Sequence, residues 1–197
     1  MLKRVFDILA SGVGLLFLSP LFLFIAIWIK LDSEGPVFFR QIRVGRYHKN
    51  FKIYKFRSMK IGSDKGSQVT IGGHDSRITS SGYFIRKTKI DELPQLINVF
   101  IGDMSLVGPR PEVPHYVKFW TFDQLRVLDV RPGITDPASI KFRNENELLG
   151  SVDNPEKYYV EVLMQEKIKL YLNYVDNACF WYDIKLILET FKVILKE

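Results

Sequence analysis

The sequence predicts a mixed α/β domain that is held at a membrane by its N-terminal segment, with a small sheet and amphipathic helices at the membrane surface. Three observations carry this prediction. Residues 8–29 form a run of 22 residues without a charge. Short β-like runs follow in residues 34–60, and helical patterns with one apolar face close the chain at 154–175 and 180–197. The 197 residues, 47% of them apolar, are enough to bury a core and show no second domain or repeat.

The apolar run admits two arrangements in a membrane. As a straight helix it would measure about 33 Å, enough to cross the apolar core of a bilayer, and hydropathy alone favours such a spanning helix. Ser19-Pro20 near its middle favours a break, because proline removes a backbone donor. Basic residues also flank the run on both sides, which suits a re-entrant helix whose ends stay on one face: Lys3, Arg4 and Lys30. From these residues alone, both arrangements stay open.

Basic residues are concentrated in residues 30–60, beside the apolar run. This segment carries nine lysines and arginines against Asp32 and Glu34, a net charge of +7, where the whole chain carries +6. Such a cluster attracts the phosphates of nucleic acid, lipid or a phosphorylated substrate, and its place beside a membrane helix favours anionic lipid headgroups. The single cysteine, Cys179, excludes an intramolecular disulfide and a zinc site built on cysteine.

The middle of the chain alternates extended and loop patterns. Gly35-Pro36 marks a turn, and aromatic and apolar residues alternate imperfectly with lysines in residues 51–56, as in a strand. Residues 61–82 are rich in Gly, Ser and Thr and are expected to form a long loop. We interpret His74-Asp75 within it as surface residues rather than a catalytic pair.

The stretch IDELPQLINVF places two carboxylates, Asp91 and Glu92, in front of an apolar helical face. Apolar side chains recur at positions 93, 96, 97 and 100, and Pro94 suits the first turn of a helix, where its missing N–H costs nothing. Asp91 would then lie at or beside the N-cap, where an aspartate accepts hydrogen bonds from free backbone N–H groups. These residues are compatible with a helix cap and with a catalytic role.

Basic residues around the acidic pair favour chemistry on phosphate. Arg86, Lys87 and Lys89 precede the pair and Arg110 follows a Pro-rich turn, and a helix start with arginines nearby suits phosphate binding. Carboxylates beside such a site suggest Mg²⁺, which binds through one or two carboxylates and substrate phosphates. A carboxylate can also attack phosphorus and form an aspartyl phosphate. The sequence contains no zinc-ligand spacing, Walker glycine loop or dinucleotide fingerprint.

Several motifs together resemble the monotopic phosphoglycosyl transferases of the bacterial sugar transferase family. They run nearly from end to end of the chain: KRVFDI, the apolar run broken at Ser19-Pro20, GPVFFRQIRVG, FKIYKFRSM, IRKTKIDELPQLINVFIGDMSLVGPRPE, VRPGIT and FWYDIKLILET. The block at 91–111 is long and highly specific.

The resemblance implies a reaction and its setting. Such enzymes move a sugar 1-phosphate from a UDP-sugar to a polyprenol phosphate such as undecaprenyl phosphate, release UMP and use Mg²⁺. Residues 1–30 would form a re-entrant membrane helix, and residues 31–197 a catalytic domain on the cytoplasmic face of the bacterial inner membrane. The expected partners are both substrates, the lipid bilayer and downstream glycosyltransferases, and not nucleic acid. The chain resembles the minimal catalytic form, without the added N-terminal membrane region of larger relatives.

The resemblance also implies roles for particular residues. Asp91 would form a covalent phospho-sugar intermediate, and Glu92 would help to hold Mg²⁺. Four arginines are expected to bind phosphates or the nucleotide: Arg86, Arg110, Arg131 and Arg143.

The chain departs from the family pattern at several positions. Where many members have glycine after PGIT, this chain has Asp136, and where many have an aspartate it has Tyr171. Glu145 and Glu147 are candidates for the contact which that aspartate would make. These changes leave the sugar and the glycan pathway open. Asp183 is either a structural helix carboxylate or a residue near the site.

Two functions of other classes stay open beside the transferase. A non-catalytic adaptor at the membrane surface, with the basic segment bound to anionic lipid or nucleic acid, predicts salt-sensitive binding that does not depend on Asp91. A Mg²⁺-dependent nucleotide-sugar hydrolase would use water as the acceptor and release UMP without a lipid.

Overall fold

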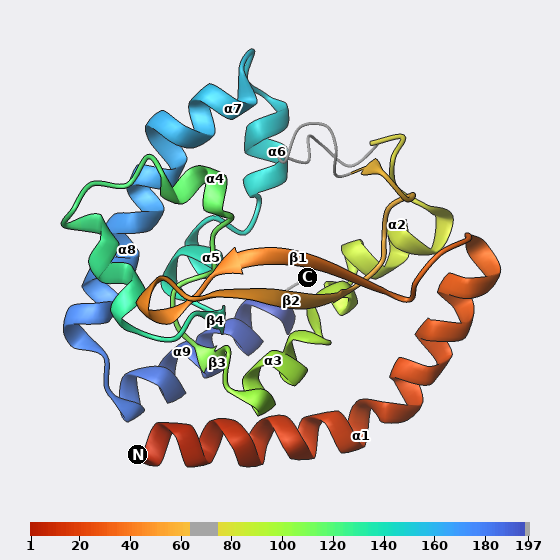
Figure 1. The fold of residues 1–197 in the computed structure, drawn as a ribbon, viewed down its shortest axis with the longest axis horizontal. Helices are drawn as coiled ribbons and strands as arrows, with labels where there is room; N and C mark the ends of the chain where they lie inside the picture. The colour runs from red at the N-terminus through yellow and green to blue at the C-terminus, as the bar shows by residue number, and fades with distance from the viewer. Residues whose placement is uncertain (64–74, 196–197) are drawn as a thin grey trace.

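The strands of this protein form two small sheets rather than one continuous layer (Figure 1). β1 (Phe38–Val44) and β2 (Asn50–Phe56) pair as an antiparallel hairpin, which confirms the extended pattern expected within residues 34–60. In its register, Gln41 lies opposite Ile53. The computed structural model describes two ranges of the chain, 1–63 and 75–195.

The second sheet and the short helices fill the rest of the chain. β3 (Ser105–Val107) and β4 (Gly133–Thr135) form a short parallel pair. Short helical elements pack around both sheets: η1 (Arg46–His48), α2 (Ser80–Lys87), η3 (Ile90–Glu92), α3 (Gln95–Ile101), α4 (Pro114–Val117), η4 (Gln124–Asp129), α5 (Pro137–Lys141), α6 (Glu145–Gly150) and α7 (Pro155–Tyr158). Three elements follow α7 to the end of the described chain: the π-helical turn η5 (Tyr159–Leu163), α8 (Met164–Asn177) and α9 (Phe180–Leu195).

α1 (Leu2–Asp32) is long and apolar enough to cross a membrane by its length and composition. Pro20 lies inside it, and Figure 1 shows its two halves meeting at an angle, with the first half beneath the other elements and the second half rising at their side near α2. A proline inside a helix removes one backbone hydrogen bond and kinks the helix. The helix is thus bent but not interrupted. Large apolar side chains of both halves are exposed: Leu9, Leu16, Phe17, Leu23, Phe24 and Ile27.

Both ends of α1 are bonded to the same folded unit. Near its start, the Lys3 ammonium lies 2.6 Å from the Asp183 carboxylate of α9. At its end, the Asp32 carboxylate accepts hydrogen bonds from the backbone N–H and the hydroxyl of Ser81 at 2.9 and 2.8 Å. Ile29, which is fully buried, packs in one cluster with Ile85 of α2. The helix is therefore fixed at two points to one body.

The largest apolar core lies among the helices of the second half of the chain. Ile168 and Tyr171 of α8 are buried there together with Val127 of η4 and Leu163 of η5. This core holds α8 behind the loop between β3 and α4, which carries part of the candidate site described below.

The helical predictions for the end of the chain are confirmed, with one refinement. The pattern at 154–175 forms α7, the π turn η5 and α8 instead of one regular helix, and the pattern at 180–197 forms α9. The loop expected at 61–82 ends earlier, because α2 begins at residue 80 with the hydroxyl of Thr79 accepting a hydrogen bond from the Gly82 N–H at 3.0 Å. His74 lies outside the described residues.

Part of the basic cluster is turned into the protein. Arg57, which is 4% exposed, donates hydrogen bonds to the carbonyls of Ser33 and Glu34. Arg43 donates to a backbone carbonyl and Lys55 to a carboxylate, both described below. The +7 segment is therefore not one continuous surface for lipid headgroups.

Candidate active site around Asp91 and Glu92

The acidic pair lies on one 3₁₀ turn between α2 and α3. Lys89, two residues after the end of α2, adopts a left-handed conformation with φ 58°, and its N–H donates to the Arg86 carbonyl at 3.1 Å. This closes α2 and turns the chain into η3, which carries both carboxylates. Neither η3 nor α3 has a side-chain hydrogen bond at its N-cap. Asp91 is therefore not the helix cap that its place in the sequence allowed.

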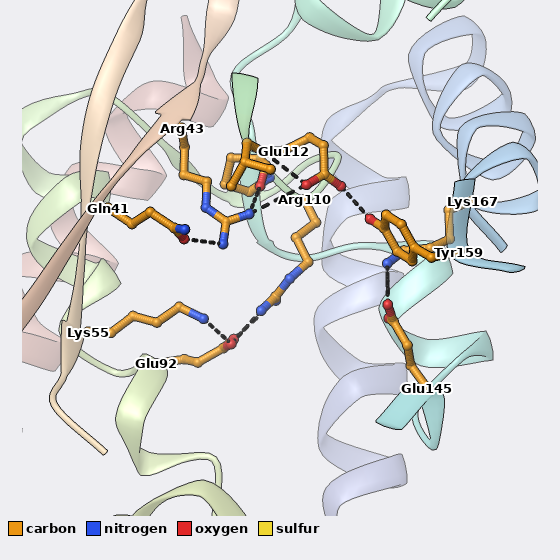
Figure 2. A network of polar contacts seen from close by, with 11 residues as sticks. Gln41, Arg43, Lys55, Glu92, Arg110, Glu112, Glu145, Tyr159 and Lys167 are labelled. Atoms are coloured by element: carbon orange, nitrogen blue, oxygen red, sulfur yellow. Dashed lines mark hydrogen bonds and ion pairs between the residues drawn. The ribbon is translucent and has the colours of Figure 1, made fainter. Parts of the chain in front are cut away.

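Glu92 is held between two cations (Figure 2). Its Oε1 accepts a hydrogen bond from Lys55 Nζ at 2.7 Å, and Arg110 donates to both carboxylate oxygens, at 3.1 Å to Oε2. Burial alone would raise the pKa of Glu92, but the two positive charges outweigh it and hold that pKa well below its ordinary value. Glu92 is therefore a fixed negative charge that orders Lys55 and Arg110.

Asp91 lies beside this cluster but outside its hydrogen bonds. The residue is 7% exposed, and its carboxylate makes no hydrogen bond or ion pair with another residue in the described part of the chain. Burial raises the pKa of Asp91 to about 6, helped by the charge of Glu92 and opposed by the charges of three basic side chains: Lys55, Arg86 and Arg110. At neutral pH the carboxylate is thus ionised and unbonded, which suits a nucleophile.

Arg86, from the last turn of α2, completes the surroundings of Asp91. Its charge lies close enough to lower the pKa of Asp91. Within residues 1–63 and 75–195 its guanidinium has no hydrogen bond or ion pair. A half-buried arginine of this kind beside a carboxylate can receive a phosphate placed against that carboxylate.

Arg110 projects from a close crossing of two backbone segments. Gly108 and Gly133 meet backbone to backbone: a Cβ on Gly133 would lie 2.1 Å from the Gly108 nitrogen. Pro109 and Pro111 on either side of Arg110 restrict the φ angles of the loop. The loop therefore presents the guanidinium from a stiff base.

The end of this loop is tied to β1 and to η5 (Figure 2). Arg43 of β1 donates to the Pro111 carbonyl at 3.1 Å and to Gln41 Oε1 at 2.7 Å. The Glu112 carboxylate accepts a hydrogen bond from the Tyr159 hydroxyl at 2.5 Å and lies 3.6 Å from the Arg43 guanidinium. These contacts connect the candidate site to the helical core.

Two of the expected arginines are bonded to other parts of the chain. Arg131 Nε donates to the Gly102 carbonyl at 2.9 Å, and Arg143 donates to the Val193 carbonyl of α9. A phosphate-binding role for either residue stays a prediction. Asp183 pairs with Lys3 and accepts a hydrogen bond from the Tyr174 hydroxyl at 2.7 Å, so it joins α1, α8 and α9 as a structural carboxylate.

The residues at the positions that depart from the family pattern make structural contacts within the protein. Asp136 is fully buried and caps α5, where its carboxylate accepts hydrogen bonds from the N–H and the hydroxyl of Ser139 at 2.8 and 2.5 Å. Tyr171 is buried in the core. Glu145 pairs with the Lys167 ammonium at 2.9 Å. Among the described residues, no group of three or more His, Cys, Asp or Glu side chains is placed to hold a metal.

Lys55 is a site residue that was not predicted from the sequence. It lies two positions after the buried Ile53 on the same strand, so both side chains project from the same face of the hairpin. A lysine on the buried face of a strand needs a partner for its charge. That position in the alternating pattern is the signal that could have identified Lys55.

Comparisons with known proteins match nearly the whole of this chain. The family model described as bacterial sugar transferase matches residues 1–197. The chain is 39% identical over 193 residues to UDP-glucose:undecaprenyl-phosphate glucose-1-phosphate transferase of Escherichia coli, covering 96% of this chain and 39% of the relative. It is 38% identical over 194 residues to the sugar transferase EpsL of Bacillus subtilis, covering 98% of this chain and 87% of the relative.

A third relative has a different sugar in its name. The chain is 40% identical over 199 residues to UDP-N-acetylgalactosamine-undecaprenyl-phosphate N-acetylgalactosaminephosphotransferase of Aeromonas hydrophila, covering 98% of this chain and 44% of the relative. The chain thus spans about two fifths of the length of the Escherichia and Aeromonas proteins. The family match extends over the whole chain, and the chain belongs to the bacterial sugar transferase family.

Proposed function

We propose that the protein is a phosphoglycosyl transferase that moves a sugar 1-phosphate from a UDP-sugar to undecaprenyl phosphate. Two of the relatives are named as transferases that use UDP-glucose or UDP-N-acetylgalactosamine together with undecaprenyl phosphate. The observation that carries the proposal for this chain is Asp91: a buried carboxylate, unbonded among the described residues, beside the charges of Glu92, Lys55, Arg86 and Arg110.

In this proposal Asp91 is the nucleophile. One of its carboxylate oxygens attacks the phosphorus that bears the sugar, the bond from that phosphorus to the bridging oxygen breaks, and UMP leaves with the electron pair. The sugar phosphate is then bound to Asp91 as an acyl phosphate. A phosphate oxygen of undecaprenyl phosphate attacks the same phosphorus, releases the carboxylate and forms the lipid diphosphate sugar. One site serves both substrates in turn.

The arginines supply positive charge to the phosphates. Arg86 suits a direct contact, because its guanidinium is unpaired within the described chain. Arg110 stays bonded to Glu92 and directs its remaining N–H groups toward the incoming diphosphate. Fixed donors that face the charge developing on phosphate oxygens stabilise the transition state, since they need no reorientation during the reaction.

A Mg²⁺ ion fits this site together with the substrate. Glu92 Oε1 is bonded to Lys55 and Arg110, whereas Oε2 accepts only the 3.1 Å contact from Arg110 among the described residues. Protein-bound Mg²⁺ commonly uses one or two carboxylates and completes its shell with substrate phosphates and water. We therefore expect Glu92 Oε2 and the diphosphate to hold the ion. When bound, Mg²⁺ would neutralise the diphosphate and ease the departure of UMP.

We further propose that α1 is re-entrant and that the site faces the cytoplasm at the inner membrane. A spanning helix would place its ends about 30 Å apart on opposite sides of the apolar layer. Here Lys3 is bonded to Asp183 and Asp32 to Ser81, within one folded unit. The bend and the exposed apolar side chains of both halves also support a helix that enters the bilayer and returns.

Release of UMP tests the proposed reaction. The purified protein in nanodiscs with Mg²⁺ is offered a panel of UDP-sugars, with and without undecaprenyl phosphate. We expect sustained UMP release from one donor only when the lipid is present, and close to one UMP per protein without it. Asp91→Asn should abolish both signals, whereas Asp176→Asn, an exposed aspartate paired with Arg126, should leave them unchanged.

The other outcomes separate the competing functions. Sustained release without the lipid would identify a hydrolase. No release from any donor, together with salt-sensitive vesicle binding that is unaffected by Asp91→Asn, would favour the membrane-surface adaptor.

A further inference from the structure

The loop that carries Arg110 is held from behind by a tyrosine with no part in the chemistry above. The Tyr159 hydroxyl donates a hydrogen bond to Glu112 Oε2 at 2.5 Å, and Tyr159 is only 6% exposed. Glu112 lies two residues after Arg110, so this bond fixes the end of the loop. Figure 2 shows Tyr159 reaching Glu112 from the helical side while Arg110 extends to Glu92 on the other.

The position of Tyr159 is itself tightly determined. It begins the π-helical turn η5 between α7 and α8, and single π turns inside helices are frequent at functional sites. Its ring packs against the ring of Tyr116 with centroids 4.9 Å apart, and the Lys167 ammonium lies 5.4 Å from its centroid. The Tyr159 hydroxyl therefore has little freedom to leave Glu112.

Glu112 contacts residues of several structural elements. Its Oε1 accepts a hydrogen bond from the Val113 N–H at 2.9 Å and lies 3.6 Å from the Arg43 guanidinium. Its backbone carbonyl accepts a hydrogen bond from the Val44 N–H of β1 at 2.9 Å. The Tyr159 hydroxyl is the contact that ties this carboxylate to the helical core.

We propose that Tyr159 is a positioning residue of the active site: through Glu112 it holds the loop so that Arg110 meets Glu92 and the substrate diphosphate. This inference rests on the proposed transferase function. Among the described residues, the Tyr159 hydroxyl bonds to Glu112 and has no hydrogen bond to Asp91. Without its hydroxyl, the Glu112 carboxylate would lose a donor and turn toward other partners, and the base of Arg110 would loosen. A misplacement of about 1 Å in such a group can slow a reaction strongly.

The neighbouring Tyr116 provides a matched control. It is buried in the same aromatic cluster, and its hydroxyl is buried without a hydrogen-bond partner among the described residues. Tyr116→Phe and Tyr159→Phe thus remove the same atom from adjacent rings, but only the second removes a bond to Glu112.

The experiment compares kcat and KM for the UDP-sugar donor in these two variants. Both proteins are assayed as the full chain in nanodiscs, below the unfolding midpoint of each. We expect Tyr159→Phe to lower kcat about tenfold with little change in KM, since hydrogen bonds to charged groups are among the stronger ones. Tyr116→Phe should match the wild type. Equal kcat in the two variants would overturn the proposal.

A double-mutant cycle tests whether the effect passes through Arg110. If it does, Tyr159→Phe combined with Arg110→Lys should be no slower than Arg110→Lys alone. Independent, multiplied losses would contradict the inference. Should Tyr159→Phe fail to fold, Glu112→Gln, which keeps an oxygen acceptor for the hydroxyl, should retain more kcat than Glu112→Leu, and equal kcat would again contradict it. A wild type that releases no UMP would instead refute the proposed transferase function.

Discussion

The Lys55 ammonium lies 2.7 Å from Glu92 Oε1, and this ion pair joins the β-hairpin to the turn that carries Asp91, the proposed nucleophile. Burial lowers the pKa of Lys55, opposed by the charge of Glu92. Lys55 also lowers the pKa of Asp91. Together with Arg110, this lysine therefore lowers the pKa of both carboxylates of the pair.

Lys55→Met tests this relationship, because methionine has a similar length and no charge. Glu92 keeps Arg110 as a partner, while the pKa of Asp91 should rise once an opposing positive charge is gone. We expect donor-dependent UMP release at pH 7 to fall about tenfold or more and to recover partly at higher pH. Lys52→Met, on an exposed position of the same strand, is the control. If Lys55→Met kept the pH profile of the wild type, Lys55 would not control the ionisation of Asp91.

The sequence predicted the elements whose patterns are local. The apolar run predicted the helix α1, the alternation in residues 51–56 predicted the strand β2, and the helical pattern from residue 154 predicted the helix α8. It did not predict the π turn at Tyr159, because the residue is placed by packing against Tyr116 and Lys167, which no local periodicity reports. Local sequence patterns predict that a helix forms, but they do not predict a π turn within it.

The candidate site was predictable only in part, for a similar reason. Arg86 and Asp91 are close in the sequence, so one turn brings them together, whereas Lys55 and Glu92 are 37 positions apart and Glu112 and Tyr159 are 47 apart. Pairs at such separations depend on how the elements pack. The family resemblance supplied Arg110 but could not show that it is already paired with Glu92.

Asp91→Asn should abolish UMP release and stabilise the fold at alkaline pH. The pKa of Asp91 is raised from 3.8 to about 6, so the folded state disfavours the charged form. The neutral Asp91 carboxyl therefore stabilises the folded state below the pKa that this group has in the unfolded chain. This stabilisation is lost as the pH rises to about 6. At pH 8 the asparagine variant should be more stable by up to about 3 kcal/mol.

Unfolding midpoints measured at pH 8 and near pH 4 check this expectation. The advantage of Asp91→Asn should be clear at pH 8 and should shrink toward pH 4, where the wild-type carboxyl is largely neutral. Lower stability of the variant at pH 8 would show that the charged carboxylate is favoured in the folded protein.

Arg86→Gln should move the pH dependence of the donor reaction. The charge of Arg86 lowers the pKa of Asp91, so its removal raises that pKa above about 6. We expect the acid limb of kcat/KM for the UDP-sugar, set by ionisation of the nucleophile, to shift to higher pH, with weaker donor binding. Arg126→Gln makes the same change at an exposed arginine and should leave the profile in place. If the acid limb did not shift in Arg86→Gln, the charge of Arg86 would not influence the ionisation of Asp91.

Gly133→Ala should disrupt the base of the Arg110 loop. Its Cβ would lie 2.1 Å from the Gly108 nitrogen, and the surrounding atoms are backbone that cannot move aside cheaply. We expect a loss of more than about 4 kcal/mol or failure to fold. Gly62→Ala has a left-handed φ of 81° but no atom within 4 Å of its Cβ, so it should cost only about 1–2 kcal/mol. Expression and unfolding midpoints of both variants measure the difference, and a Gly133→Ala protein as stable as Gly62→Ala would contradict the close crossing.

The topology of α1 can be read from cysteine labelling in a Cys179→Ser background. Leu2, Phe17 and Leu31 are each more than half exposed, and they sample the start, the first half and the end of the helix. If α1 is re-entrant, Leu2→Cys and Leu31→Cys should react with an impermeant thiol reagent from the cytoplasmic side only, in inverted vesicles. Phe17→Cys should be protected by lipid. The wild-type Cys179, which is exposed, reports the side on which the folded domain lies.

A spanning helix would place Leu2→Cys and Leu31→Cys on opposite sides, which would require the Lys3–Asp183 or the Asp32–Ser81 contact to break. Labelling of both ends from one side, together with Cys179, is therefore the result that the bonded ends of α1 demand.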